Sequence, residues 1–435
     1  MDAEAPSPCP PASFLRADME NITAVILAAG LGTRMKSDLP KVLHPAGSGT
    51  LLGKVISNLK KAGIEDLVVV VGHKAEQVEE FFKKEKIRFV RQKELLGSGD
   101  ALRCALEAAG DMGESILVTC GDAPLITAGT YRALAEKYRA SGASAAVLTC
   151  VMEDAGSYGR IVRDAGGEIL GIVEAKDADE EEILIKEVNA GTYCFNRELA
   201  GRFIREIELN EKKKEFYLTD IVKILKSSGE RVVTGECRSE EAVGVNTRKD
   251  LAVVNAELNR EKLERLMESG VTIMDPSATW IDETAEIGRD TVIFPDTVIE
   301  GDVRIGEGCR IGPFARIRPG TDISGNVEIG NFVEINRTTI GEGTKVKHHT
   351  YLGDAAVGRG VNIGAGVITA NYDGKEKHRT VVEDEVFIGV GAVLIAPVKI
   401  GKGAVIGAGS VVTRNKDVAA GETVVGVPAR PFERS

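Results

Sequence analysis

The sequence predicts an α/β domain with a mostly parallel sheet over residues 22–247, followed by a parallel β-helix of hexapeptide repeats over 271–435. Two observations predict this fold class. Apolar strand candidates alternate with amphipathic stretches in the first part, and an aliphatic residue recurs at every sixth position in the second. The length of 435 residues also exceeds what one domain usually needs, so we expect more than one hydrophobic core.

The first domain contains short apolar runs that are typical of buried strands, with helical stretches such as 74–84 and 99–109 between them. The strand candidates are 24–28, 67–71, 87–90, 115–120 and 143–151. This alternation is typical of a largely parallel sheet, which binds its ligands at the carboxyl ends of the strands. We therefore look for functional residues in the loops that follow these strands.

The second domain repeats with a period of six, which fits neither a helix nor a simple strand. The register slips by one residue before Ile340 and again before Val357. The full series is Ile281, Ile287, Ile293, Ile299, Ile305, Ile311, Ile317, Ile323, Ile329, Ile335, Ile340, Val346, Leu352, Val357, Ile363, then after an insertion Val382, Ile388, Leu394, Ile400, Ile406 and Val412. Three hexads make one triangular coil, and coils stack about 4.8 Å apart. Glycines directly after aliphatic residues, such as Gly306 and Gly312, predict tight corners with positive φ.

Two further segments complete the organisation of the chain. Residues 248–270 are charged and carry leucines at helical spacing, with no Gly or Pro over 249–268, which predicts a linker helix. Residues 1–21 are rich in Pro, Ala and Ser up to residue 18, and we expect this leader to be disordered.

The composition excludes several classes of protein. The net charge is −11, which disfavours nucleic acid as the main partner because a phosphate backbone would be repelled. No apolar run is long enough to span a membrane. The seven cysteines are scattered singly, so we expect no disulfide and no structural zinc. The sequence therefore predicts a soluble cytoplasmic protein with small-molecule ligands.

A glycine-rich loop follows the first predicted strand. Residues 27–35 read Leu-Ala-Ala-Gly-Leu-Gly-Thr-Arg-Met, and Lys41 lies shortly beyond them. Such a loop lets backbone N–H groups approach phosphates closely, while Arg34 and Lys41 supply the charge needed to hold a triphosphate. The loop is neither a P-loop nor a dinucleotide-binding G-x-G-x-x-G motif.

With this loop, the chain resembles the sugar-1-phosphate nucleotidyltransferases, and among them the bifunctional family that makes UDP-N-acetylglucosamine. Further stretches that carry the resemblance are Gln92 with 96–99, 121–125, 158–160, 172–176, 187–191, 215–220 and 244–246. The resemblance implies a Rossmann-like nucleotidyltransferase domain followed by a left-handed parallel β-helix, and it covers nearly the whole chain. It also implies two activities. The β-helix would acetylate glucosamine-1-phosphate from acetyl-CoA, and the first domain would transfer uridylyl from UTP to N-acetylglucosamine-1-phosphate.

The resemblance assigns roles in the first domain residue by residue. The positions implied to bind UTP or its uridine are Leu27, Ala28, Ala29, Gly30, Lys41, Gln92, Gly97 and Ser98. The sugar phosphate would contact Gly159, Glu174, Asn189 and Thr219. Asp122 and Asn246 would hold Mg²⁺, which prefers oxygen ligands, and Arg34 and Lys41 would be catalytic by absorbing charge on the departing pyrophosphate.

The resemblance also implies an acetyltransferase site in the β-helix, in a family that is normally trimeric. His348 would be the catalytic base, oriented by Glu334, while the adjacent His349 should point to the opposite side of the strand. The positions implied to bind the amino-sugar phosphate are Arg318, Asn336, Tyr351, Asn362 and Lys377, helped by Asn371 and Tyr372. Acetyl-CoA would contact Ala365, Asn371, Tyr372, Val390 and Ala408, with the N–H of Ala365 steadying the oxyanion.

Several positions depart from the family pattern and keep alternatives open. Leu31 and Ser98 replace a usual Lys and Thr in the first domain; Asn336 and Val390 replace a usual Lys and Ser in the second, and Gly426 falls near a usual Arg. One alternative is a nucleotidyltransferase whose β-helix has a different acyl acceptor or is inactive. A noncatalytic assembly scaffold is the other alternative.

Overall fold

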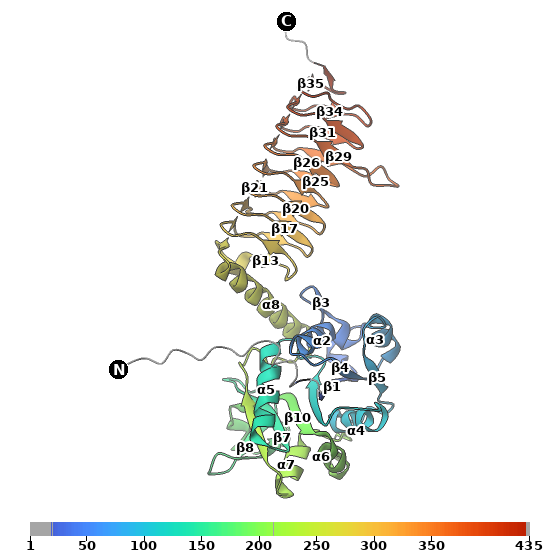
Figure 1. Ribbon diagram of the computed structural model, residues 1–435, viewed down its shortest axis with the longest axis vertical. Coiled ribbons are helices and arrows are strands. Elements are labelled where there is room, and N and C mark those ends of the chain that lie inside the picture. The colour runs from blue at the N-terminus through green and yellow to red at the C-terminus, as the bar shows by residue number, and fades with distance from the viewer. Residues whose placement is uncertain (1–18, 20, 212, 432–435) are drawn as a thin grey trace, which may run out of the picture. The chain divides into compact units, whose positions relative to one another are not determined.

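The structure is a computed structural model and describes residues 19, 21–211 and 213–431 (Figure 1). It divides after Asn255 into two compact units. The predicted fold class is confirmed, because the first unit is an α/β domain around a mostly parallel sheet and the second is a stack of short parallel strands. Most of the predicted leader lies outside the described residues; of its described members, Met19 is buried in the core of the first unit.

The sheet of the first unit has the order β11-β7-β10-β6-β1-β4-β5. These strands are Val232–Glu236, Ala145–Val151, Glu187–Asn196, Ser115–Cys120, Ile22–Ala28, Asp66–Val71 and Arg88–Arg91. All neighbours in this path are parallel except β10, which runs antiparallel to both β6 and β7. A hairpin of β8 (Arg160–Arg163) and β9 (Ile169–Val173) extends the sheet through β10.

Helices cover both faces of this sheet, and alternate residues of the central strand β1 feed two different cores. Ala24 and Ile26 pack with one set of helices, and Val25 packs with the other. The first set is α2 (Leu51–Lys61), α3 (Ala75–Phe81) and α5 (Ala128–Ser141); the second is α4 (Ser98–Ala108), α6 (Arg197–Phe203) and α7 (Asp220–Ser227). The period-two alternation of a strand thus builds a three-layer domain.

Strand β10 is the main element that the sequence patterns missed, together with β8, β9 and β11. Its pairing with β7 shifts register between Asn189 and Tyr193, around Gly191 at φ +70°. A strand broken by such a bulge shows no continuous apolar run, so the pattern that revealed β1 and β6 is absent there.

The second unit is a β-helix with three flat faces (Figure 1). The first face is β12 (Thr272–Ile273), β15 (Val292–Ile293), β18 (Arg310–Ile311), β21 (Glu328–Asn331), β24 (Lys345–His348), β27 (Asn362–Ile363), β30 (Phe387–Ile388), β33 (Val405–Ile406), β35 (Thr423–Val425) and β36 (Arg430–Pro431). The second is β13 (Trp280–Ile281), β16 (Val298–Ile299), β19 (Arg316–Ile317), β22 (Glu334–Asn336), β25 (Tyr351–Gly353), β28 (Ile368–Ala370), β31 (Val393–Ile395) and β34 (Val411–Val412). The third is β14 (Glu286–Ile287), β17 (Val303–Ile305), β20 (Thr321–Ile323), β23 (Thr339–Ile340), β26 (Ala355–Val357), β29 (Thr380–Val382) and β32 (Val398–Ile400).

The predicted inward residues stack in register along these faces. Ile293 pairs with Ile311 in the next coil, and after the first slip Ile323 pairs with Ile340, one residue sooner. All members of the predicted series are buried except Ile287 in the first coil, which is half-buried. The repeat therefore forms one continuous aliphatic core.

Most glycines at the corners are required for a different reason from the positive φ that the sequence suggested. Gly312 does have φ +94°, but Gly306 and Gly330 do not lie in the left-handed region. Instead, a Cβ on Gly330 would lie 1.9 Å from the carbonyl oxygen of Lys347 in the next coil. Close stacking of the coils, rather than positive φ, excludes larger residues there.

Helix α8 (Arg248–Glu268) spans the boundary between the two units. Its second half belongs to the β-helix unit, where Leu263 and Leu266 enter the core. Asn259 donates through Nδ2 to the Thr279 carbonyl at 2.8 Å and accepts the Ile281 N–H at 3.0 Å. This half of α8 thereby covers the first coils of the β-helix.

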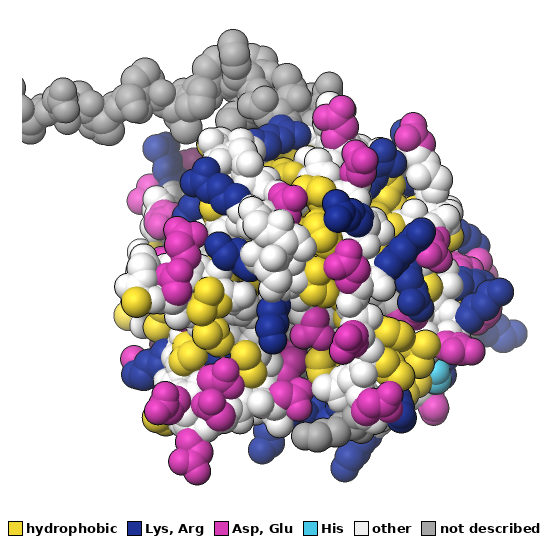
Figure 2. Space-filling view, turned by 90° about the horizontal axis from the view of Figure 1, so that it is seen from below, with side chains coloured by type: hydrophobic (Ala, Val, Ile, Leu, Met, Phe, Trp, Pro, Cys, Tyr) yellow, Lys and Arg dark blue, Asp and Glu magenta, His cyan; other side chains and the backbone are white. Residues whose placement is uncertain are grey.

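Acidic and basic side chains are interspersed on the face shown in Figure 2. The figure shows no single basic region there. Within the described ranges, none of the helices combines the length and the apolar character that a bilayer crossing requires.

Candidate active sites

Two neighbouring strands of the first unit bring the glycine-rich loop and Asp122 to the same edge of the sheet. β1 ends at Ala28 and β6, its parallel neighbour, ends at Cys120. The Val245 N–H donates to the Asp122 carbonyl at 2.9 Å, which places the segment of Asn246 beside this edge. Residues far apart in sequence therefore meet where a parallel sheet binds its ligands.

A cavity of about 540 Å³ lies at this edge. All positions implied to bind UTP line it, namely Leu27, Ala28, Ala29, Gly30, Lys41, Gln92, Gly97 and Ser98. Asp122, Asn246 and Glu174 also line it, as do Leu31, Val42, Leu95, Ala101, Cys120, Lys176, Glu215 and Tyr217, to which sequence reasoning gave no role in this cavity. Lys176, Glu215 and Tyr217 lie within stretches that carry the family resemblance, so that signal was available.

One cation and two oxygen groups converge in this cavity, and a second cation, Arg34, contacts one of these oxygen groups. The Lys41 ammonium forms an ion pair with the Asp122 carboxylate and lies 3.4 Å from Asn246 Oδ1. Arg34 donates through Nη2 to the same Asn246 oxygen at 2.9 Å. The two oxygen groups are the hard ligands that Mg²⁺ takes from a protein when phosphate oxygens and water fill its other positions. The donor set therefore fits a magnesium ion bound together with a triphosphate.

Gln92 is fixed beside the glycine-rich segment 96–99. Its Nε2 donates to Asp100 Oδ2 at 2.7 Å and to the Gly97 carbonyl at 3.0 Å. The Ser98 hydroxyl accepts the Leu218 N–H at 3.1 Å. The two bonds from Nε2 hold the amide of Gln92 in one orientation and leave Oε1 as its acceptor.

The four residues implied to bind the sugar are linked in two pairs. Thr219 donates through Oγ1 to Glu174 Oε1 at 2.9 Å, and the Asn189 N–H donates to the Gly159 carbonyl at 2.9 Å. Burial raises the pKa of Glu174, and nearby Asp220 raises it further. Of these four residues, only Glu174 lines the cavity of about 540 Å³ described above.

Cys120 also lines this cavity, but its chemistry is unsuited to nucleophilic attack. Burial raises the pKa of its thiol to about 12, with a further contribution from Asp122. A thiol with this pKa stays protonated near neutral pH.

A column of equivalent positions runs up one corner of the β-helix. Val346, Ile363, Ile388, Ile406 and Val424 pair in succession along the first face. The residues two positions later therefore also stack, and these are His348, Ala365, Val390, Ala408 and Gly426. Hydrogen bonds between coils follow the same line, since the Gly391 N–H donates to the Ala365 carbonyl at 2.8 Å and the Gly409 N–H to the Val390 carbonyl at 2.7 Å. The fold thus aligns the implied base with three implied acetyl-CoA positions.

His348 ends β24, and its ring contacts Asn331 of the previous coil. The distance from His348 Nδ1 to Asn331 Oδ1 is 2.9 Å. Glu334, expected to orient His348, instead accepts from Arg318 Nη1 at 2.8 Å. Glu334 lies on the second face, next to the strand of Arg318, whereas Asn331 is the register partner of His348 on the first face. In this chain the His348 ring is therefore in contact with Asn331 and not with Glu334.

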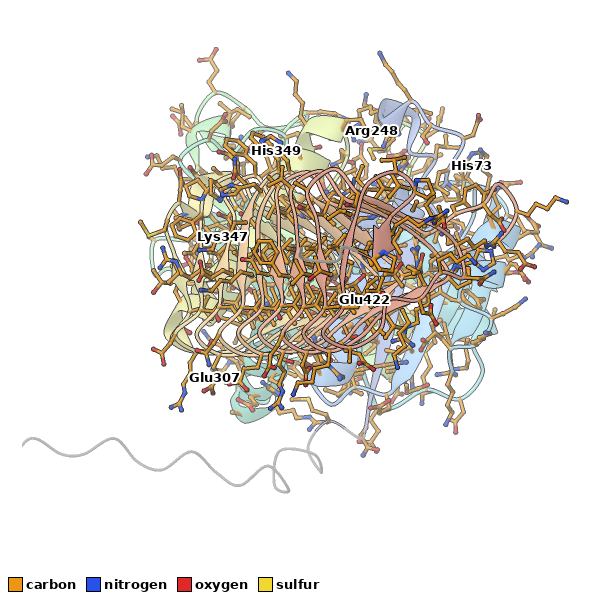
Figure 3. The ribbon with its side chains drawn as sticks, turned by 90° about the horizontal axis from the view of Figure 1, so that it is seen from above. His73, Arg248, Glu307, Lys347, His349 and Glu422 are labelled. Atoms are coloured by element: carbon orange, nitrogen blue, oxygen red, sulfur yellow. The ribbon has the colours of Figure 1, made fainter. Side chains whose placement is uncertain are left out.

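The adjacent His349 has a separate environment. Its φ is +45°, and its ring stacks on Phe332, which stacks in turn on Phe314, with centroid distances of 5.0 and 5.2 Å. Figure 3 labels Lys347 and His349, which lie on the outer side of the coils. A turn residue in an aromatic stack is less suited to proton transfer than His348.

The remaining implied acetyltransferase residues gather mainly on the second face. Arg318 directly follows β19, Tyr351 begins β25 and Asn336 ends β22. Asn336 is 5% exposed and accepts from Arg337 Nη1 at 3.0 Å, while Arg337 binds both carboxylate oxygens of Asp354 at 2.6 and 2.8 Å. Asn371 also donates to Asp354. Asn362, by contrast, lies on the first face. Most residues implied to bind the amino sugar therefore lie on the second face, whereas His348 ends a strand of the first face and Ala365, Val390 and Ala408 follow strands of that face.

The fold and the two clusters define a nucleotidyltransferase domain joined to a hexapeptide transferase domain. The family model of the MobA-like NTP transferase domain matches residues 24–182, and that of the bacterial transferase hexapeptide (six repeats) matches 284–319 and 379–414. The chain belongs to the family of bifunctional GlmU proteins.

Curated relatives match over nearly their full length. Bifunctional protein GlmU of Carboxydothermus hydrogenoformans is 45% identical, covering 90% of this chain and 95% of that protein. The protein of the same name from Syntrophomonas wolfei is 44% identical, covering 91% and 95%. A solved structure of a putative glucose-1-phosphate thymidylyltransferase from Bacillus anthracis is 20% identical and covers 54% of this chain and 94% of its own, with a TM-score of 0.44, a similarity too weak to bear on the fold.

Proposed function

We propose that the two units catalyse consecutive steps in the synthesis of UDP-N-acetylglucosamine. The β-helix transfers the acetyl group of acetyl-CoA to the amine of glucosamine-1-phosphate. The first unit then joins the product to UMP from UTP and releases pyrophosphate. The observation that carries the proposal is the convergence of Lys41, Asp122 and Asn246 in a cavity lined by every position implied to bind UTP, with Arg34 bound to Asn246.

In the uridylyl transfer, an oxygen of the sugar phosphate attacks the α-phosphorus of UTP, and the bond to the departing pyrophosphate breaks. Asp122 and Asn246 would hold Mg²⁺, which supplies charge neutralisation for the phosphates when bound. Lys41 and Arg34 place two positive charges beside these ligands, where they stabilise the charge that develops on pyrophosphate. Gln92 presents Oε1 towards the nucleobase, because its Nε2 is engaged elsewhere.

In the acetyl transfer, the amine of glucosamine-1-phosphate attacks the thioester carbonyl, and the carbon–sulfur bond breaks. Because Asn331 presents an amide oxygen to His348 Nδ1, that nitrogen carries the hydrogen and Nε2 keeps its lone pair. Nε2 can then accept the proton from the attacking amine and pass it to the leaving thiolate. The column of Ala365, Val390 and Ala408 provides small or apolar positions along which the coenzyme arm lies.

We further propose a homotrimer formed through the β-helix. In one chain His348 ends a strand of the first face, while most residues implied to bind the amino sugar lie on the second, so an association of β-helices would let neighbouring chains complete each acetyl-transfer site. We also place the enzyme in the cytoplasm, where its small-molecule substrates occur. Analytical ultracentrifugation of the full chain tests the trimer, and a monomer that transfers acetyl groups would refute it.

The test of the function is mass spectrometry of products from the purified full-length protein. One tube contains Mg²⁺, UTP, acetyl-CoA and glucosamine-1-phosphate, and a second supplies N-acetylglucosamine-1-phosphate instead of the first sugar and acetyl-CoA. UDP-N-acetylglucosamine in both tubes supports both steps. Product in the second tube alone would refute the acetyl-transfer step and favour a different acyl acceptor. Asn336 would then be the first residue to examine, because it is buried and stands where the family usually has a Lys.

One variant separates the two activities within one chain. Asp122→Ala removes a proposed metal ligand and the partner of Lys41, and we expect uridylyl transfer to fall by about 10²–10³-fold while acetyl transfer is unchanged. Unchanged uridylyl transfer would refute the role of Asp122.

A further inference from the structure

The segment 371–379 is an insertion in the β-helix between β28 and β29. Val357 pairs with Val382, so this coil is seven residues longer than the regular coil in which Ile293 pairs with Ile311. The insertion carries Asn371, Tyr372 and Lys377, which are proposed to bind the acetyl-transfer substrates. The inference below rests on that proposed function.

Packing does little to fix this segment. Among its nine residues, Asn371 is buried and His378 is half-buried, whereas the others are exposed. At the base, Asn371 donates to Asp354, the His378 N–H donates to the Asn371 carbonyl at 2.7 Å, and Tyr372 pairs with Lys377. Within one chain, polar contacts therefore set the conformation of the tip.

Asp373 makes those contacts through both of its oxygens. Its Oδ1 accepts the N–H groups of Lys375 and Glu376 at 2.9 and 2.8 Å, which forms the turn at the tip. Its Oδ2 accepts from His378 Nε2 at 2.7 Å and from Arg414 Nη2 at 2.9 Å. The Glu376 N–H, followed by the His378 side chain, holds the pKa of Asp373 below its usual range, so the carboxyl is ionised near neutral pH.

Arg414 belongs to a different part of the β-helix. It follows β34, which lies two strands further along the second face than β28. Its guanidinium also contacts His378 Nε2, so one side chain meets two residues of the insertion. An exposed ion pair of this kind adds little to the free energy of unfolding, so fold stability alone does not explain it.

We propose that Asp373, His378 and Arg414 form a latch that holds 371–379 in the conformation that binds the acetyl-transfer substrates. Arg414 is a positioning residue, since it acts through the insertion. When the latch is broken, the insertion samples other conformations, and Asn371, Tyr372 and Lys377 are correctly placed for only part of the time. The apparent dissociation constant for substrate therefore rises, because it equals the intrinsic constant divided by the fraction of molecules that remain competent.

The test uses full-length Asp373→Asn, Arg414→Gln and the double variant. Asparagine keeps the Oδ1 acceptor of the turn but replaces Oδ2 with a donor, so it breaks the latch and spares the turn. We expect each single variant to raise the KM of acetyl transfer by about two- to fivefold with little change in kcat, and the double variant to be no worse than either. Arg414→Lys, which keeps the charge, should recover part of the loss.

Two controls are built into the chain. Uridylyl transfer from N-acetylglucosamine-1-phosphate should be unchanged in every variant, because the latch lies wholly within the β-helix unit. Arg304→Gln breaks an exposed ion pair of the same β-helix, in which Arg304 Nε lies 3.3 Å from Glu286 Oε2, and should leave both activities unchanged.

The outcomes are distinct. Wild-type protein without acetyl transfer to glucosamine-1-phosphate would refute the proposed function itself. Wild-type activity with an unchanged KM in Arg414→Gln would overturn the latch. Additive effects of the two substitutions would also overturn it, because the two residues would then act independently. A fall in kcat without a rise in KM would overturn it too, because the latch acts through substrate binding.

Discussion

Gly97→Ala tests whether the backbone of segment 96–99 shapes the nucleotide cavity. Gly97 has φ +96° and ψ −177°, a conformation that costs other residues about 1–3 kcal/mol. A Cβ there would lie 2.7 Å from the carbonyl oxygen of Phe216 and 3.0 Å from Glu215 Cβ. The Phe216 backbone cannot retreat freely, because its N–H donates to the Leu96 carbonyl at 2.7 Å and its carbonyl accepts the Gly99 N–H at 2.8 Å.

The cost of the substitution has two parts. Backbone strain contributes about 1–3 kcal/mol, and overpacking against a fixed backbone contributes a similar amount, about 1–3 kcal/mol. If the chain relieves the clash by moving the segment, Gln92 loses its bond to the Gly97 carbonyl and Ser98 shifts in the cavity wall. Loss of only 1.4 kcal/mol of binding free energy would raise the KM for UTP about tenfold.

The assay measures the KM for UTP and the thermal unfolding of Gly97→Ala beside a matched control. Gly201→Ala is that control, because Gly201 lies inside helix α6 and nothing lies within 4 Å of the Cβ it would gain. A helical glycine replaced by alanine should gain about 0.5–1 kcal/mol of stability. Acetyl transfer in both variants should match wild type.

One result would refute this reasoning. If Gly97→Ala keeps the wild-type KM for UTP and unfolds at the same temperature as Gly201→Ala, the segment tolerates a side chain. The backbone conformation and the contact with Phe216 would then not limit the cavity.

Three further predictions concern single side chains. His348→Asn should lower kcat for acetyl transfer by about 10²–10⁴-fold and leave uridylyl transfer unchanged, as measured by coenzyme A release. The pKa of Glu174 is raised by burial, so its carboxylate takes up a proton at a higher pH than an ordinary glutamate as the solution is acidified. Uridylyl transfer should therefore lose activity in that range, and Glu174→Gln should remove this acid limb from the pH profile. Ile335→Ala empties a fully buried position of the β-helix core and should cost about 2–5 kcal/mol in the free energy of unfolding, measured by denaturant titration.

Contrary outcomes are equally specific. Acetyl transfer that survives in His348→Asn would assign the proton transfer to another group. An acid limb that persists in Glu174→Gln would mean that Glu174 does not control it. A loss below about 1 kcal/mol in Ile335→Ala would mean that the neighbouring coils collapse into the space.

Much of the first domain could be predicted from local patterns. The strands β1 and β6 are continuous apolar runs, and the loop after β1 carries its glycines and Arg34 within a few residues. Lys176 and Tyr217 were not given roles, although both line the cavity and lie within stretches that carry the family resemblance. Their placement depends on long-range contacts between segments.

The sequence by itself determined the two-part architecture, because the spacing of apolar residues within short segments is enough to predict both the alternating strands and helices and the six-residue repeat. Through the family resemblance it also named eight positions implied to bind UTP, all of which line one cavity at the carboxyl edge of the sheet. Only the tertiary structure decided which side chain contacts His348. Asn331 lies beside it on the first face, 17 residues earlier in the neighbouring strand, whereas Glu334 lies on the second face. Contacts between coils depend on which face each side chain occupies, and a list of candidate residues does not specify that.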